Sequence, residues 1–367
     1  MSDLKTRYDL QDLQSQTIAY LRFPLIIGVV FVHAYYGDTT LLRQLSPVMN
    51  PGSACYYITQ FFSQVLGRIS VPLFFFISGF LFFFNNDLTL KKNIDKLKHR
   101  VHTLLIPYLI WGALALLFFS AVVRIPFLSA MYPIQSKLMA NFNGRDILSS
   151  FWMLNNGLPL SGQFWFIRNL MLAVLLTPIF KLSVVHLKTY SLPFFILLCA
   201  ILSYFHIVVF GITTFLYFFA GAYFSINKYN VALQFRKLFT VSCFLYPIFA
   251  FADLFTKSYS FNVYIDKIGI LVGVIFFFNL TSYLLENKNV HVIKFLSEAT
   301  FFVFAAHEPL QTFIKGLAFQ ILKPTMEWQV IVLYFLIPAI TILICLGLYN
   351  LLKKHLPRVM RVLTGRG

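Results

Sequence analysis

The sequence predicts an all-α fold, a polytopic helical bundle with about ten transmembrane helices. Of its 367 residues 59% are hydrophobic and only 12% are charged, which is about half the charged fraction of a soluble domain. Its mean hydropathy is +0.75, and several uncharged runs approach or exceed the roughly 20 residues that cross a bilayer as a helix. These runs do not alternate as barrel strands do, and backbone groups in lipid must be paired within their own segment, so helices are expected.

The apolar runs divide into ten expected spans. The fifth and sixth form one uncharged stretch, which we divide at Gly211. The second is long, and Pro72 is expected to kink it. In order, the spans are Thr17–Tyr36, Tyr56–Phe84, Thr103–Val123, Gly162–Phe180, Leu192–Phe210, Gly211–Ile226, Leu238–Phe255, Ile265–Leu285, Ser297–Leu317 and Trp328–Leu352.

The distribution of basic residues predicts that both termini are cytoplasmic. With the N-terminus inside, 19 basic residues lie in inner segments and eight in outer loops, the bias that orients membrane proteins. This bias accounts for the net charge of +17, so the expected partner is the lipid bilayer and not nucleic acid. The predicted organisation is a cytoplasmic segment 1–16, a transmembrane domain 17–352 and a basic cytoplasmic tail 353–367. The long outer loop after residue 124 is expected to hold a short amphipathic element within "NFNGRDILSSFWMLNNGLP".

Several classes of site are missing from the sequence. The four cysteines have no metal or redox spacing, so no metal site is expected. There is no Walker loop, zincin motif or nucleophile elbow. This argues against ATP-driven transport by this chain alone and leaves secondary transport open.

Arg22 and His33 are two ionisable residues in the first expected span, within "RFPLIIGVVFVH". Eleven residues at about 100° each make three helical turns plus about 20°, so both side chains share one face, about 16 Å apart along the axis. Arg22 alone could extend to the headgroups, and His33 alone could be an interfacial histidine. Their shared face favours a functional role, because intramembrane ionisable residues usually face a cavity.

Other polar residues in the expected spans are few. His307 and Glu308 lie near the middle of the ninth span, where the alternative is a helix–helix hydrogen bond. Arg68 and Arg168 are candidate supporting residues, and the alternative for each is a side chain that extends to the outer membrane interface. Ser78, which precedes Gly79, is favoured as part of a close helix contact.

A basic cluster precedes the third span in "LKKNIDKLKHRVHTLLIPY". It could enforce topology or meet anionic lipid. It is also a suitable binding site for a cytoplasmic acyl donor that carries phosphate groups, with Arg100 as the candidate donor-binding residue.

Across nearly its whole length the chain resembles the acyltransferase 3 family of integral-membrane O-acyltransferases. The resemblance is carried by the order and spacing of "LRFPLIIGVVFVHA", "SVPLFFFISGFLF", "KHRVHTLLIPYLIWG", "FWFIRNLMLAVLLTP", "FLYFFAGAYF" and "FFVFAAHEPL". It implies ten core helices with cytoplasmic termini. It also implies acyl transfer, often from acetyl-CoA, to sugar hydroxyls of surface polysaccharides.

The resemblance assigns roles to four positions. The family's signature histidine and arginine fall on His33, as general base, and on Arg22, and its late-helix histidine falls on His307. Arg100 matches one of two arginines common before the third span, while Thr103 stands where the second is common. Without an added esterase-like domain, the chain is similar to the stand-alone O-acetyltransferases of surface polysaccharides.

The resulting hypothesis is a multi-pass O-acetyltransferase of a bacterial inner membrane, with acetyl-CoA as donor substrate and no bound cofactor. His33 would take the proton of a glycan hydroxyl, Arg22 would hold a donor phosphate or carbonyl, and Arg68 or Arg168 would stabilise the oxyanion. Direct transfer and an acyl-histidine intermediate both remain open. The alternative function is a secondary transporter or flippase for a glycan or small anion.

Overall fold

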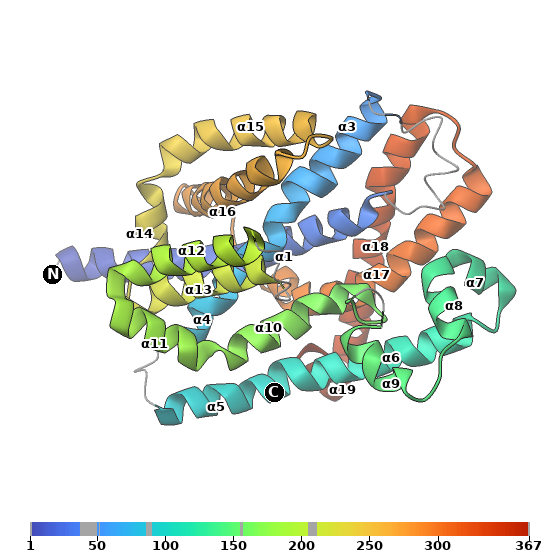
Figure 1. Cartoon of the computed structure of the whole chain (residues 1–367), viewed down its shortest axis with the longest axis horizontal. Helices are drawn as coiled ribbons and strands as arrows, with labels where there is room; N and C mark the ends of the chain where they lie inside the picture. Colours follow the sequence, from blue (N-terminus) through green and yellow to red (C-terminus); the bar gives the residue numbers. More distant parts are fainter. Residues whose placement is uncertain are drawn as a thin grey trace. The chain divides into compact units, whose positions relative to one another are not determined.

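The regular structure of the chain is helical throughout the part that is described. The computed structural model describes residues 2–36, 50, 52–85, 90–154, 157–204 and 211–365, and every regular element in them is a helix (Figure 1). Seven helical segments in these residues are long and apolar enough to cross a membrane, and Thr214–Ile226 is a shorter apolar helix. The polytopic all-α class is confirmed, while the count of ten spans and the positions of the termini stay predictions.

The chain forms two compact units, which are described separately. The first unit comprises Met1–Val32, Gln60–Ile94 and Ala173–Thr300. The second comprises His33–Thr59, Asp95–Leu172 and Phe301–Gly367.

Helix α1 (Ser2–Ala34) is uninterrupted, although Pro24 lies within it. Arg22 and His33 therefore lie on one helix, as predicted. In the first unit, the Gln14 side chain accepts a hydrogen bond of 2.6 Å from the Val231 backbone N–H, and Thr17 Oγ1 lies 3.0 Å from Ser282 Oγ. These bonds hold α1 to α14 (Val231–Arg236) and α16 (Asn262–Glu286).

The second expected span is irregular just before Pro72. It begins as α3 (Ala54–Gln60), passes through a π-helix (Phe61–Leu66) and a 3-10 turn (Gly67–Ile69), and continues as α4 (Ser70–Phe83). Proline lacks an N–H and its ring collides with the carbonyl four residues earlier, so it disturbs the turn that precedes it. The predicted disturbance is present, but it lies on the N-terminal side of Pro72.

Two glycines allow α4 and α13 (Ile212–Ile226) to pack backbone to backbone in the first unit. A Cβ added to Gly79 would lie 2.0 Å from the Phe218 carbonyl oxygen, and one added to Gly221 would lie 2.0 Å from that of Phe76. This is the close helix contact favoured for the segment around Ser78. Gly211, with a φ of +67°, precedes α13 and confirms the division between the fifth and sixth spans.

The helix of the fourth expected span ends earlier than predicted, at Leu175. After a 3-10 turn (Gly162–Phe164), α10 (Trp165–Leu175) is followed by α11 (Thr177–Leu187), so the predicted end at Phe180 lies inside a helix. Pro178 lies in the first turn of α11, where a missing N–H costs nothing. The chain leaves α11 at Lys188, where φ is +48°, and α12 (Ser191–Tyr204) follows a 3-10 turn (Lys188–Tyr190).

The first unit also contains a pair of long helices. These are α15 (Phe239–Thr256) and α16, which run side by side (Figure 1). A cluster of charged side chains joins them near the turn between the two helices, and its bonds are compared below with those of the candidate site.

The second unit supplies the helices around the candidate site. After His33–Thr59, it contains the part of α5 (Leu90–Arg100) from Asp95 onward, a π-helix (Val101–Leu105) and α6 (Ile106–Val122). Its C-terminal part is α17 (Lys294–Leu322) from Phe301 onward, α18 (Glu327–His355) and α19 (Pro357–Thr364). Between α6 and α10 lie α7 (Pro126–Met131), α8 (Pro133–Ala140) and α9 (Asp146–Trp152), of which α9 is the expected short element.

A buried apolar core fixes α7 and α8 beside α6 (Figure 1). It includes Phe119 and Val122 of α6 together with Met131, Tyr132 and Met139. Because Tyr132 lies between α7 and α8, this packing determines which face α8 presents to α17.

Candidate active site

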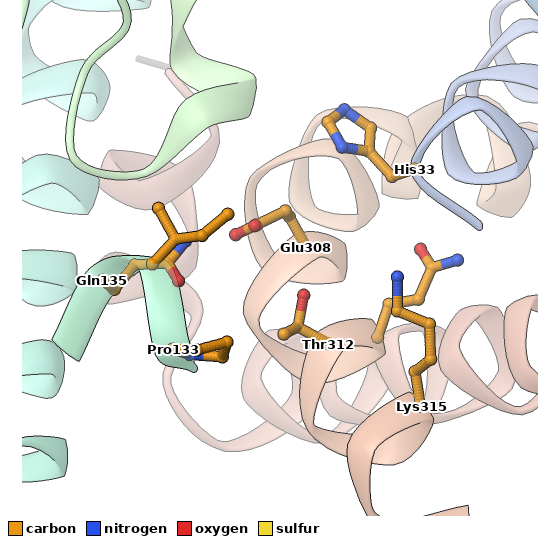
Figure 2. Close-up of a pocket in the computed structure, with 8 residues that line it drawn as sticks. His33, Pro133, Gln135, Glu308, Thr312 and Lys315 are labelled. Carbon is orange, nitrogen blue, oxygen red and sulfur yellow. The ribbon is translucent and has the colours of Figure 1, made fainter. Parts of the chain in front are cut away.

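A stripe of polar side chains runs along α17 in the second unit. His307, Gln311 and Lys315 are four residues apart, as are Glu308 and Thr312, a spacing that places side chains on one side of a helix. A cavity of about 120 Å³ is formed there. It is lined by His33, Pro133, Ile134, Gln135, Glu308, Gln311, Thr312 and Lys315 (Figure 2).

The structure brings the two predicted histidines together. The ring centroids of His33 and His307 are 5.1 Å apart, and their planes meet at 67°. His33 is half-buried at the end of α1, whereas His307 has no exposed surface. The sequence assigned them to separate spans, so their contact is a result of the tertiary fold.

The backbone of α17 orients the His307 ring. Nδ1 lies 2.7 Å from the Phe304 carbonyl oxygen and 3.1 Å from that of Val303. Because a carbonyl only accepts hydrogen bonds, we assign the proton of the neutral ring to Nδ1, which leaves a lone pair on Nε2. Nε2 is buried and has no hydrogen-bond partner among the described residues.

Pro309 in α17 leaves a backbone carbonyl that needs a hydrogen-bond donor from another segment. Pro309 has no N–H, so the Ala305 carbonyl loses its helical partner. Gln163 Nε2 donates to that carbonyl at 3.2 Å, and Ser161 donates to Gln163 Oε1 at 2.9 Å. The segment before α10 is thereby held against the polar part of α17.

Tyr132 fixes the α8 wall of the cavity to the same part of α17. Its hydroxyl donates to the Pro309 carbonyl at 2.8 Å. Burial, together with the neighbouring Glu308 carboxylate, raises the pKa of Tyr132 above its usual value, so the hydroxyl stays a donor at neutral pH. This bond places Pro133 and Gln135 at the cavity (Figure 2).

The cavity is lined by one basic residue, Lys315, that was not among the candidates predicted from the sequence. Lys315 is only 7% exposed, although the topology count assigned it to an outer loop. Glu308 was a candidate, and its Oε2 is buried without a hydrogen-bond partner among the described residues. Gln311, Thr312 and Lys315 follow His307 and Glu308 at helical spacing, and this pattern could have identified them.

Arg168 is committed to the backbone of a neighbouring segment. It is 3% exposed, and its Nη1 donates to the carbonyls of Trp152, at 2.5 Å, and Gly157, at 2.8 Å. The guanidinium also lies 5.6 Å from the centre of the Trp152 ring. This burial excludes the alternative in which Arg168 extends to the interface, and the residue is not among those that line the described cavity.

Three candidates lie in the first unit. Arg68 Nε donates to Gln64 Oε1 at 2.9 Å, and Nη1 lies 3.7 Å from an Asp266 carboxylate oxygen. Ser78 is half-buried on α4, and Arg22 is half-buried on α1.

Arg100, the proposed donor-binding residue, is in the second unit. It ends α5 and is half-buried, directly before the π-helix Val101–Leu105. Irregular turns of this kind are frequent at functional sites.

Comparison with known proteins identifies the class. The acyltransferase 3 family model, described as an acyltransferase domain, matches residues 16–350. The chain belongs to this family and is a multi-pass membrane acyltransferase. It is also 26% identical over 364 residues to the succinoglycan biosynthesis protein ExoH of Rhizobium meliloti, with 96% of this chain and 92% of that protein covered. No solved structure matches the chain.

Proposed function

We propose that the protein transfers an acetyl group from acetyl-CoA to a sugar hydroxyl of a cell-surface polysaccharide or lipid-linked glycan. The observation that carries this proposal is a polar cavity, in a member of an acyltransferase family, where His33 contacts His307. The glycan acceptor is supported by the relative named for succinoglycan biosynthesis. An inner membrane of a bacterium is the proposed location, because it separates the cytoplasmic donor from the surface glycan.

In the proposed reaction His33 is the general base. Its imidazole takes the hydroxyl proton as the acceptor oxygen bonds to the thioester carbon, which converts the carbonyl oxygen into an oxyanion. The oxyanion collapses, the carbon–sulfur bond breaks, and the CoA thiolate leaves and takes the proton from the imidazolium. A covalent acyl-histidine route would use the same cavity and stays open.

The cavity lining suits a hydroxyl-bearing acceptor. Gln135, Gln311 and Thr312 contribute amide and hydroxyl groups, which both donate and accept hydrogen bonds. The His307 ring contacts the His33 ring, and its buried Nε2 has no hydrogen-bond partner among the described residues. We assign binding of the glycan acceptor to Gln135, Gln311 and Thr312. We assign to His307 the role of supporting His33 as the general base.

The donor is assigned to two arginines. Arg22 would bind a phosphate of acetyl-CoA, and Arg100 would bind a phosphate through a charge-assisted hydrogen bond. Family membership favours acyl transfer over the alternative transporter or flippase.

The test is the release of free thiol from acetyl-CoA by protein purified in lipid nanodiscs. Removing a positioned base costs about 10²–10⁴-fold in rate, so His33→Ala should lose thiol release at normal membrane abundance. His186→Ala changes an exposed histidine on α11 and should behave as wild type. Near-normal thiol release by His33→Ala would remove His33 as the base, and unchanged acetyl content of surface glycans in cells lacking the protein would refute the acceptor class.

A further inference from the structure

The carboxyl group of Glu308 and the amine of Lys315 lie in the wall of one cavity. They are seven residues apart on α17, about two helical turns, and both line the cavity with His33 (Figure 2). Lys315 is 7% exposed, and one Glu308 oxygen is buried without a hydrogen-bond partner among the described residues. Buried charges are costly, and apolar residues of similar volume often replace a buried ion pair without loss of stability. Stability alone therefore does not account for this pair.

The reaction proposed above creates a matching pair of charges from neutral reactants. When His33 takes the hydroxyl proton it becomes an imidazolium, and the thioester carbonyl oxygen becomes an oxyanion as the new carbon–oxygen bond forms. Charges fixed in advance beside both positions stabilise such a transition state without reorganisation at the moment of reaction. The wall of the cavity offers one acidic and one basic side chain for the two positions.

We propose that Lys315 is the catalytic cation that stabilises the oxyanion and that Glu308 stabilises the imidazolium of His33. The proposal rests on the proposed function and extends it. Lys315 meets the substrate oxygen, whereas Glu308 acts through His33. When the carbon–sulfur bond breaks, the oxyanion returns to a carbonyl and the imidazolium gives its proton to the thiolate, so both charges again face neutral groups.

The other candidate cations of the second unit, Arg168 and Arg100, are not among the residues that line the described cavity. Arg168 donates to the carbonyls of Trp152 and Gly157, and Arg100 ends α5. Among the described residues that line the cavity, Lys315 is the cationic side chain beside His33 and Glu308. The placement of Lys315 therefore favours it over Arg168 for the oxyanion.

A double-mutant cycle separates this role from that of a structural ion pair. The variants are Glu308→Gln, Lys315→Met and the double variant, with Lys137→Met on an exposed part of α8 as the matched control. Each single variant leaves one buried charge without its counterpart, so each should lower the melting temperature. The double variant removes both charges and should recover the melting temperature.

Activity should not recover in the double variant. We expect a fall in kcat for thiol release from acetyl-CoA of about 10²-fold in Lys315→Met, with a similar loss in the double variant and little change in the KM for acetyl-CoA. Lys315→Arg, which keeps the charge, should lose less than Lys315→Met.

Three results would overturn the inference. Recovery of kcat together with stability in the double variant would make the pair structural, and an effect confined to KM would make Lys315 a donor-binding residue. In both cases the wild type is active, so the proposed function stands. A wild type that releases no thiol would instead refute the proposed donor, and this inference with it.

Discussion

Two buried polar clusters, one in each unit, differ in how completely their atoms are paired. In the first unit Lys257 Nζ lies 2.7 and 2.9 Å from the two Asp253 carboxylate oxygens, and Asn262 Nδ2 donates to Asp253 at 2.8 Å. Asp266 adds a longer contact to Lys257 at 3.7 Å. In the second unit, the cluster around His33 leaves His307 Nε2 and one Glu308 oxygen without partners among the described residues.

The difference separates a structural cluster from a functional one. A fully paired network specifies one packing of its helices, while an unpaired buried polar atom is costly and calls for an explanation. In the second unit the unpaired atoms occur beside a polar cavity with a titratable base. Loss of a group from the first cluster should therefore lower stability without a specific loss of rate, and loss of a group from the second cluster should lower the rate of thiol release, whether or not stability also falls.

The largest expected effect is on stability, in Lys257→Met. The side chains of Lys257 and Asp253 are 16% and 4% exposed, so the variant leaves a buried carboxylate without its cation, at a cost of about 3–5 kcal/mol. Thermal unfolding in detergent should show a clear loss, while Lys267→Met, at an exposed position of the same helix α16 as Asp266, should not. A normal melting temperature with a lost rate would contradict the comparison.

The next effect is on rate, in His307→Leu. This variant removes the Nε2 lone pair beside His33 and gives up only the local bond from Nδ1 to the backbone. We expect thiol release from acetyl-CoA to fall about 10²-fold, the lower end of the loss for a group that assists proton transfer, with a melting temperature close to wild type. His291→Leu, at an exposed position, is the control. If stability falls as it does in Lys257→Met, His307 belongs with the structural cluster.

The fold follows from the sequence where a single residue or run decides the local structure. Long uncharged runs must form helices in lipid, and Gly211, whose φ is positive, directly precedes the start of α13 within one of these runs. The break at Leu176 was not predicted, because Pro178 is tolerated in a first turn as well as at a helix end. The choice between these two outcomes depends on tertiary packing.

The candidate site was predictable in part, because its single residues can be recognised in the sequence while their contacts depend on tertiary packing. His33 and His307 were selected because ionisable residues in apolar helices are rare. Their contact requires the end of α1 to lie against α17. The approach of Gln135 requires α8 to lie against α17, which depends on the Tyr132–Pro309 hydrogen bond and on the core around Phe119. Lys315 was counted among the basic residues of the outer loops, and its burial beside the cavity depends on the tertiary fold.

The smallest expected effect is that of Arg68→Ala, and it tests the comparison most narrowly. Arg68 belongs to the paired cluster through Asp266, at 3.7 Å, but its side chain is 48% exposed. An ion pair exposed to this degree contributes about 0.2–1 kcal/mol, so thermal unfolding should change little. The rate of thiol release should also stay near wild type, because the contacts of Arg68 are with Gln64 and Asp266. If the rate fell as far as is expected for Lys315→Met, with stability unchanged, the hypothesis that Arg68 stabilises the oxyanion would be supported again. Pairing would then no longer distinguish the two clusters, because a paired side chain would have proved to be catalytic.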